Sequence, residues 1–91
     1  SLTKALGVLQ EDGLYACALY LRAKENGNGE RILKALRALW TEQALGLTAT
    51  AADPLEYALE LTGGPLEQLL LARLAAERML TYARYSAKAR D

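Results

Sequence analysis

Leucine and alanine dominate this sequence, and that bias constrains the fold more than any other feature. Leucine occurs 20 times and alanine 17 times among the 91 residues, whereas valine and isoleucine occur once each and phenylalanine is absent. Leucine and alanine favour helices, while β-branched and aromatic residues favour strands. The composition therefore predicts an all-α fold.

The length of the chain limits how much structure it can hold. A mass of 9.9 kDa suits one globular domain, and surface scaling at that mass gives roughly 64% of the unfolded surface buried on folding. This supports one modest core and leaves little room for a deep substrate cavity. We expect a single helical domain over residues 1–91, and the start at Ser1 leaves open that residues precede it.

Hydrophobic periodicity and turn residues predict five helices, over residues 2–10, 13–25, 29–45, 54–61 and 65–89. The last helix would be about 37 Å long at 1.5 Å per residue. Its apolar residues span a broad arc, so we expect a small antiparallel bundle with this long helix at its centre. In the fourth helix, Leu55, Ala58 and Leu59 are expected to face the core.

Capping residues mark where four of these helices should begin. Asp53 followed by Pro54 is the strongest signal, because an acidic N-cap accepts from free backbone N–H groups and proline suits the first helical position. We also expect Asp12 and Asn28 to cap the second and third helices, and Pro65 to occupy the first position of the fifth.

Cysteine usage and the absence of long apolar runs indicate in which cellular compartment the protein is expected. Cys17 is the only cysteine, and its apolar neighbours indicate a small buried hydrophobic residue in a reducing environment. The longest uncharged run, residues 43–52, is shorter than the roughly 20 residues of a membrane span. No signal peptide or lipidation motif is present. We therefore expect a soluble, cytoplasmic protein with no membrane contact.

The absence of histidine removes the usual general base, the catalytic triads and the common zinc sites. Two carboxylate pairs, Glu56 with Glu60 and Glu11 with Asp12, could in principle transfer protons. Both pairs lie beside predicted helix ends, where favourable interaction with the helix dipole or solvent explains them better. We expect no enzyme activity, no cofactor and no metal.

Basic residues gather at the end of the chain although the net charge is zero. Residues 1–72 carry six basic and nine acidic side chains, net −3, and residues 73–91 carry five basic and two acidic, net +3. On a helical wheel one narrow polar face holds Arg73, Arg84 and Lys88, with Arg78 and Arg90 to either side and tyrosines between them. Arginine and tyrosine together suit phosphate contacts and base stacking.

A solvated face is the competing interpretation, because cations are favoured near helix C-termini. A second, weaker set of candidate RNA contacts lies on the third helix, at Arg31, Lys34 and Arg37, where Glu30 and Glu42 dilute the positive charge.

Two segments resemble the small subunit of type III-B CRISPR RNA-guided effector complexes, the Cmr complexes. Residues 12–21 match that family's Gly-Leu and Ala-x-aromatic-Leu elements at Gly13-Leu14 and Ala18-Leu19-Tyr20-Leu21. Residues 74–89 are similar to its C-terminal helix, with corresponding residues at Leu80, Tyr82, Arg84, Ala87 and Ala89. Tyr82 replaces a tryptophan, Tyr85 replaces a basic residue, and the family's N-terminal helix is shortened or absent.

The resemblance covers about half of the chain, and it implies a non-catalytic structural subunit used in antiviral defence. Such a subunit forms an all-helical bundle that stacks in a few copies beside the crRNA-bearing backbone subunits and lines the groove that holds the target RNA. Cleavage belongs to other subunits. Arg84 carries over as a contact to the RNA backbone, and Arg73 and Lys88 join it because they share its helical face. The residues do not distinguish this family from the small subunit of type III-A complexes.

Two other functions remain open from the sequence. A helical protein-interaction adaptor would use the basic helix to meet an acidic partner and would bind no nucleic acid. A DNA-binding helix-turn-helix protein is less well supported, because no helix after a tight turn concentrates polar, base-reading residues at its N-terminus.

Overall fold

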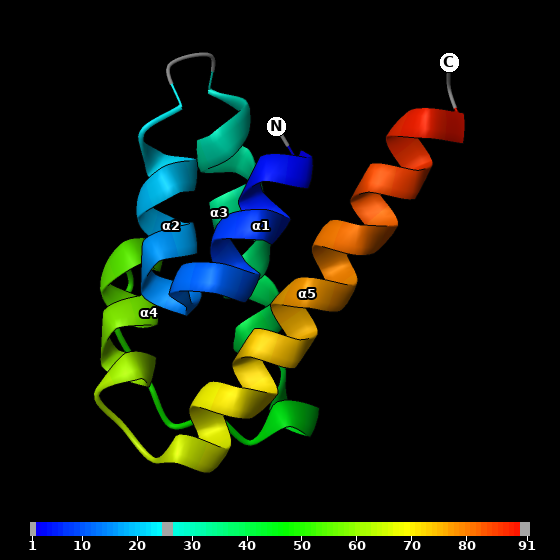
Figure 1. The fold of residues 1–91 in the computed structure, drawn as a ribbon. Helices are drawn as coiled ribbons and strands as arrows, with labels where there is room; N and C mark the ends of the chain where they lie inside the picture. Colours follow the sequence, from blue (N-terminus) through cyan, green and yellow to red (C-terminus); the bar gives the residue numbers. More distant parts are fainter. Residues whose placement is uncertain (1, 25–26, 90–91) are drawn as a thin grey trace.

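Five α-helices and one short 3-10 helix make up the computed structural model of the protein, which describes residues 2–24 and 27–89, and side chains up to residue 87 (Figure 1). The elements are α1 (Leu2–Asp12), α2 (Leu14–Arg22), α3 (Asn28–Trp40), η1 (Gln43–Leu45), α4 (Pro54–Thr62) and α5 (Leu66–Ala89). The described ranges contain no strand. The prediction of a small all-α bundle is confirmed.

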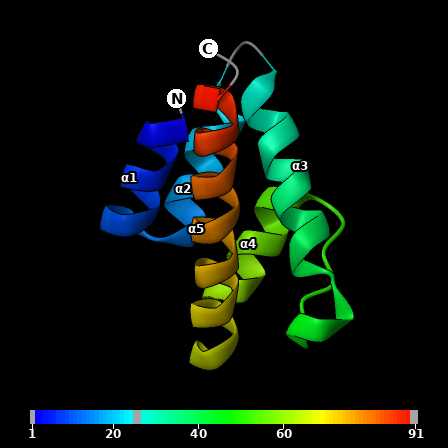
Figure 2. The same ribbon diagram turned by 90° about the vertical axis from the view of Figure 1, so that its right-hand side faces the viewer.

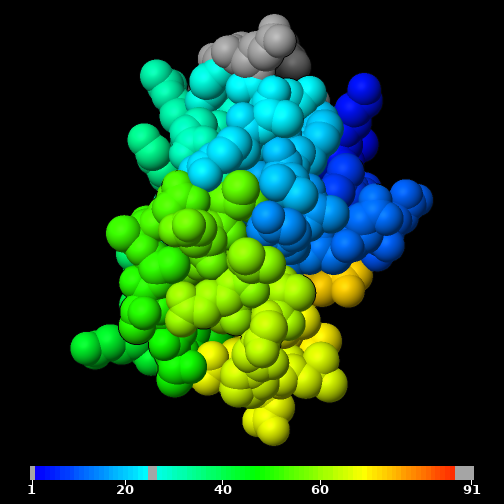
Figure 3. All heavy atoms as spheres, turned by 90° about the vertical axis from the view of Figure 1, so that its left-hand side faces the viewer, coloured from blue at the N-terminus to red at the C-terminus, as the bar shows by residue number. Residues whose placement is uncertain are grey.

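Helix α2 packs against α1, α3 and α4. Helix α5 crosses the other side of the bundle and packs against α1, α3 and α4 (Figures 1 and 2). Viewed from the opposite side, α2 and α4 cover most of the surface and only part of α5 is visible (Figure 3). The two outer faces of the bundle are therefore built from different helices.

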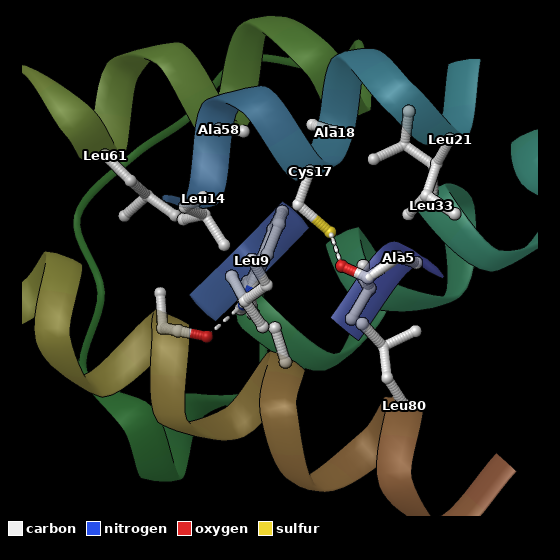
Figure 4. Close-up of a cluster of buried hydrophobic side chains, with 14 of the residues drawn as sticks. Ala5, Leu9, Leu14, Cys17, Ala18, Leu21, Leu33, Ala58, Leu61 and Leu80 are labelled. Atoms are coloured by element: carbon white, nitrogen blue, oxygen red, sulfur yellow. Dashed lines mark hydrogen bonds between the residues drawn. The ribbon is translucent and has the colours of Figure 1, made fainter. Parts of the chain in front are cut away.

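The core gathers leucines, alanines and two aromatic rings from all five α-helices. Leu9 is fully buried between α2 and α5 (Figure 4). The thiol of Cys17 is directed at the carbonyl oxygen of Ala5, with 3.5 Å between the two atoms. Burial raises the pKa of this thiol to about 11, so Cys17 is the small buried residue that its apolar neighbours predicted.

Two of the predicted caps are wrong because the helices begin on glycine. Helix α1 continues through Asp12, and the residue before α2 is Gly13, whose φ of 97° only glycine adopts readily. Asn28 is the first residue of α3, and Gly27 with φ of 79° precedes it. At both starts a glycine with positive φ, and not the predicted Asp12 or Asn28, occupies the N-cap position and redirects the backbone.

The cap of α4 is confirmed. The carboxylate of Asp53 accepts a hydrogen bond of 3.1 Å from the backbone N–H of Glu56, and Pro54 is the first helical residue. Helix α5 begins at Leu66, one residue after the predicted Pro65.

The third and fourth helices differ from their predictions near one aromatic pair. Helix α3 ends at Trp40 rather than residue 45, because Glu42 adopts an extended backbone and only the short η1 follows. In α4 the expected Ala58 is fully buried, and Tyr57 also enters the core, where it stacks on Trp40 with ring centroids 5.9 Å apart. Leu59, expected to face inward, is 51% exposed.

Candidate interaction surface on helix α5

The outward side of α5 carries large apolar side chains that no part of the described chain covers. We call this set the apolar strip; its members are Leu66, Leu70, Leu71, Leu74, Tyr82 and Tyr85. Tyr82 is 73% exposed and Leu66 is 66% exposed. Contiguous apolar surface of this kind is typical of sites where proteins meet partners.

The strip exists because α5 packs into the bundle through small residues. The fully buried positions of α5 are Ala72, Ala76 and Leu80, which follow one another at intervals of four along one face of the helix. The alanines let α5 approach its neighbours closely, and the larger leucines and tyrosines are left on the opposite side. The broad apolar arc predicted from the sequence is thus only partly covered within this chain.

Next to the strip, a groove of about 370 Å³ runs between α5 and the end of α3 with η1. We call it the α3–α5 groove; Figure 2 shows the arrangement of the two helices α3 and α5 whose residues line it. Its lining is apolar apart from one arginine and the tyrosine hydroxyl, and consists of Leu39, Leu45, Leu71, Leu74, Ala75, Arg78, Met79 and Tyr82.

Arg78 is the charged member of this surface. Its side chain is exposed and makes no ion pair with any described residue. It borders both the α3–α5 groove and a second hollow of about 550 Å³ that also touches Glu77, Tyr82 and Tyr85. An unpaired guanidinium thus stands within a largely apolar surface.

The basic residues that the sequence placed on α5 have different surroundings in the structure. Arg73 turns toward α1, where its Nη2 donates a hydrogen bond of 3.0 Å to the carbonyl oxygen of Gln10. This contact satisfies a carbonyl at the end of α1, which makes Arg73 a structural residue in the free chain. Arg78 lies on the other flank, against the groove.

Arg84 lies over the ring of Tyr85, with 5.7 Å between its guanidinium carbon and the ring centroid. Its Nε is buried and donates no hydrogen bond within the described part of the chain. The side chain of Lys88, and Arg90 as a whole, lie outside the described residues.

The three secondary candidates for RNA contacts on α3 also differ in their surroundings. Arg31 and Lys34 are exposed. Arg37 is held in place, since its Nε donates to the carbonyl oxygen of Ala51 at 3.0 Å and its guanidinium lies 5.5 Å from the centroid of the Tyr57 ring. Arg37 therefore ties the connector before α4 to α3, whereas the other two remain open to a ligand.

Sequence analysis missed one ion-pair cluster, which joins three helices. Arg22 at the end of α2 contacts Glu30 of α3 at 3.0 Å and the N-cap carboxylate of Asp53 at 2.8 Å. The guanidinium holds the pKa of Asp53 below its ordinary value of 3.8. Separations of 8 and 31 residues carry no sequence signal, and the geometry is structural because every hydrogen-bonding group is paired within the cluster.

Comparisons with protein families, with curated proteins and with solved structures find no match to this chain. Within residues 2–24 and 27–89, no group of histidine, cysteine and acidic side chains has an arrangement that could hold a metal ion. None of the helices in this part of the chain combines the length and apolar character needed to cross a membrane.

Proposed function

We propose that this chain is a non-catalytic structural subunit of a type III-B CRISPR RNA-guided effector complex, where it stacks beside the crRNA-bearing backbone and contacts target RNA. The resemblance of residues 12–21 and 74–89 to the small subunit of that complex supports the choice of complex. The observation in the structure that carries the proposal is the apolar strip on α5, of which Leu74, Tyr82 and Tyr85 lie in the second of those two segments. A subunit with such a strip buries it only when it is assembled.

The exposed strip supports an assembly role for a physical reason. Leucine and tyrosine side chains in water lose about 25 cal/mol of stabilisation for each Å² of apolar surface left uncovered. Interfaces between subunits are enriched in aromatic side chains and arginine at their centre, and the strip with Arg78 has this composition. Docking against another subunit would remove this apolar surface from water and thereby stabilise the assembly.

The proposed RNA contact rests on Arg84, with Lys88 added from the sequence. Arg84 is partly exposed and lies over Tyr85, an arrangement in which a cation and a ring both remain near the surface. Phosphate would pair with the guanidinium and an unpaired base would stack on the tyrosine. Arg73 contributes less than the helical wheel predicted, since it already bonds to Gln10.

A protein-interaction adaptor without nucleic-acid binding is the second candidate. It is favoured by the character of the exposed face of α5, which holds six large apolar side chains and one unpaired arginine. An adaptor of this kind would bind a protein partner and would not retain RNA. The CRISPR subunit would show both assembly and salt-sensitive RNA retention.

Native mass spectrometry of a type III-B effector complex, reconstituted without its own small subunit and with this chain added, tests the proposal. We expect two or more copies to enter the complex and target RNA to be held more tightly. A Leu74→Glu variant, which places charge in the strip, should fail to enter, whereas Lys34→Glu on the exposed side of α3 should enter normally.

If the folded wild-type chain does not enter the complex, the CRISPR assignment is wrong. Entry of the chain without any gain in RNA retention would reject the RNA contact and favour the adaptor.

A further inference from the structure

We propose that the α3–α5 groove is a docking site for an amphipathic α-helix of a partner protein, whose acidic side chain pairs with Arg78. This inference deepens the proposed function and rests on it in one respect, since the partner helix would belong to a neighbouring subunit. The length of the groove, its apolar lining and its single charge each define one property of the partner helix.

The dimensions of the groove suit a helix. Along α5 the lining extends from Leu71 to Tyr82, a distance of about 16 Å at 1.5 Å per residue. This length equals about three helical turns. The second wall is formed by Leu39 near the end of α3 and Leu45 in η1. An added helix would lie along α5 and contact both walls.

The lining specifies an apolar face on the occupant. Leucines and Met79 offer no hydrogen-bond donors to a ligand, so the buried side chains of the partner must be apolar. A helix presents such side chains at i, i+3 or i+4, and i+7, which is the spacing used when helices bind in grooves. Methionine adapts its shape to the side chains that pack on it.

Arg78 specifies an acidic residue beside that apolar face. Its guanidinium is exposed and free of ion pairs within the described residues. Arginine binds a carboxylate through two parallel hydrogen bonds, and the pair strengthens when water is excluded around it. Nucleic acid fits this surface less well, because the charged phosphates of its backbone would contact the apolar side chains of Leu39, Leu45 and Leu74.

Outside α5, a second copy of the chain offers no matching helix within the described residues. Outside α5, the large apolar side chains that are exposed in the described part of the chain are Leu19 on α2 and Leu59 on α4. Neither helix presents three such residues on its outer face. Helix α5 itself carries an arginine, Arg78, in the middle of its exposed side.

Binding of synthetic helical peptides to the full chain tests the inference. The probe is a capped peptide of about 16 residues, with leucines at i, i+3, i+7 and i+10, glutamates beside them, and alanine and glutamine elsewhere. A second peptide carries lysine in place of each glutamate. Fluorescence anisotropy measures both affinities, and sedimentation measures the oligomeric state.

We expect the acidic peptide to bind the wild-type chain at least tenfold more tightly than the basic one. Arg78→Glu should reverse that preference, and Ala75→Glu in the groove should abolish binding of both peptides. Lys4→Glu, an equal charge change on the exposed side of α1, should leave the preference unchanged. Circular dichroism confirms that each variant is folded.

Failure of the acidic peptide to bind, or an unchanged preference in Arg78→Glu, overturns the inference. Self-association of the wild-type chain through this face, lost in Ala75→Glu, would also overturn it by identifying a second copy as the occupant. The peptide experiment does not depend on entry of the chain into the effector complex. Peptide binding can therefore fail while the chain enters the complex, and the chain can fail to enter while the peptide binds.

Discussion

The indole nitrogen of Trp40 donates a hydrogen bond of 3.0 Å to the carbonyl oxygen of Ala72, which joins the end of α3 to the buried face of α5. Trp40 is almost completely buried and stacks on Tyr57 of α4, whose hydroxyl donates back to the Trp40 carbonyl oxygen at 3.4 Å. One residue thereby fixes the position of α5 relative to α3, and with it the width of the α3–α5 groove.

Replacing Trp40 by phenylalanine should therefore destabilise the protein. The variant loses the bond to Ala72 and leaves a small cavity beside Tyr57, so we expect the free energy of unfolding to fall by about 2–3 kcal/mol. Urea denaturation followed by circular dichroism measures the change. Lys34→Gln on the exposed side of α3 is the control, and a loss below about 1 kcal/mol in Trp40→Phe would contradict the assigned role.

Two glycines in helices should respond in opposite directions to alanine. A Cβ on Gly29 would fall on the carbonyl oxygen of Leu21 and close to the Cβ of Lys24, so the ends of α2 and α3 would have to separate. We expect Gly29→Ala to cost more than about 2 kcal/mol. Gly7 in α1 has open space at that position, and Gly7→Ala should stabilise the protein by roughly 0.5–1 kcal/mol. Equal effects in thermal unfolding would show that the close approach at Gly29 is absent in solution.

The pair of Arg22 and Asp53 should make stability depend on pH in the acid range. The folded pKa of Asp53 lies below its ordinary value of 3.8, because the guanidinium of Arg22 favours the carboxylate. The contribution to stability is therefore complete above about pH 4 to 5 and is lost as the pH falls through the folded pKa.

Asp53→Asn isolates this contribution, since asparagine is an equally good N-cap. The variant should unfold at lower urea concentration than the wild type near pH 7, and the difference should shrink below pH 4. A difference that stays constant between pH 7 and pH 2 would show that the ion pair does not act in solution.

Reversing the charge of Arg84 and Lys88 should weaken RNA retention. The change to glutamate removes two phosphate contacts, so the slope of log affinity against log salt for single-stranded RNA should become shallower by about 1.4. Lys4→Glu on α1, outside every candidate set, is the control for a single charge reversal, and its slope should stay unchanged. Filter binding over a salt titration measures the slope, and an unchanged slope would remove Arg84 from the RNA interface.

Much of the helical architecture could be predicted from local sequence. Leucine and alanine content, hydrophobic spacing, and the Asp53-Pro54 start all act within a few residues, and they located five helices with boundaries wrong by up to five residues. The wrong caps at Asp12 and Asn28 were local errors too, since each has a glycine next to it that takes the backbone through positive φ.

The arrangement of the candidate surface could not be predicted in the same way. The helical wheel placed Arg73 and Arg84 on one face of α5, but it could not show that Arg73 would bond to Gln10, a residue 63 positions away. It also counted Leu71 and Tyr82 in an apolar arc without showing which part of that arc other helices would cover.

By itself, the sequence determined that the protein is helical, that it has no histidine to serve as a general base, and that its last helix is both apolar and basic. These properties depend on residue identity and spacing along one helix. Tertiary structure alone decided that Ala72 and Ala76 would enter the core, that Leu74 and Tyr82 would stay outside, and that Arg78 would stand unpaired beside a groove. The physical reason is that burial and pairing depend on which helices meet, and those contacts join residues far apart in the chain.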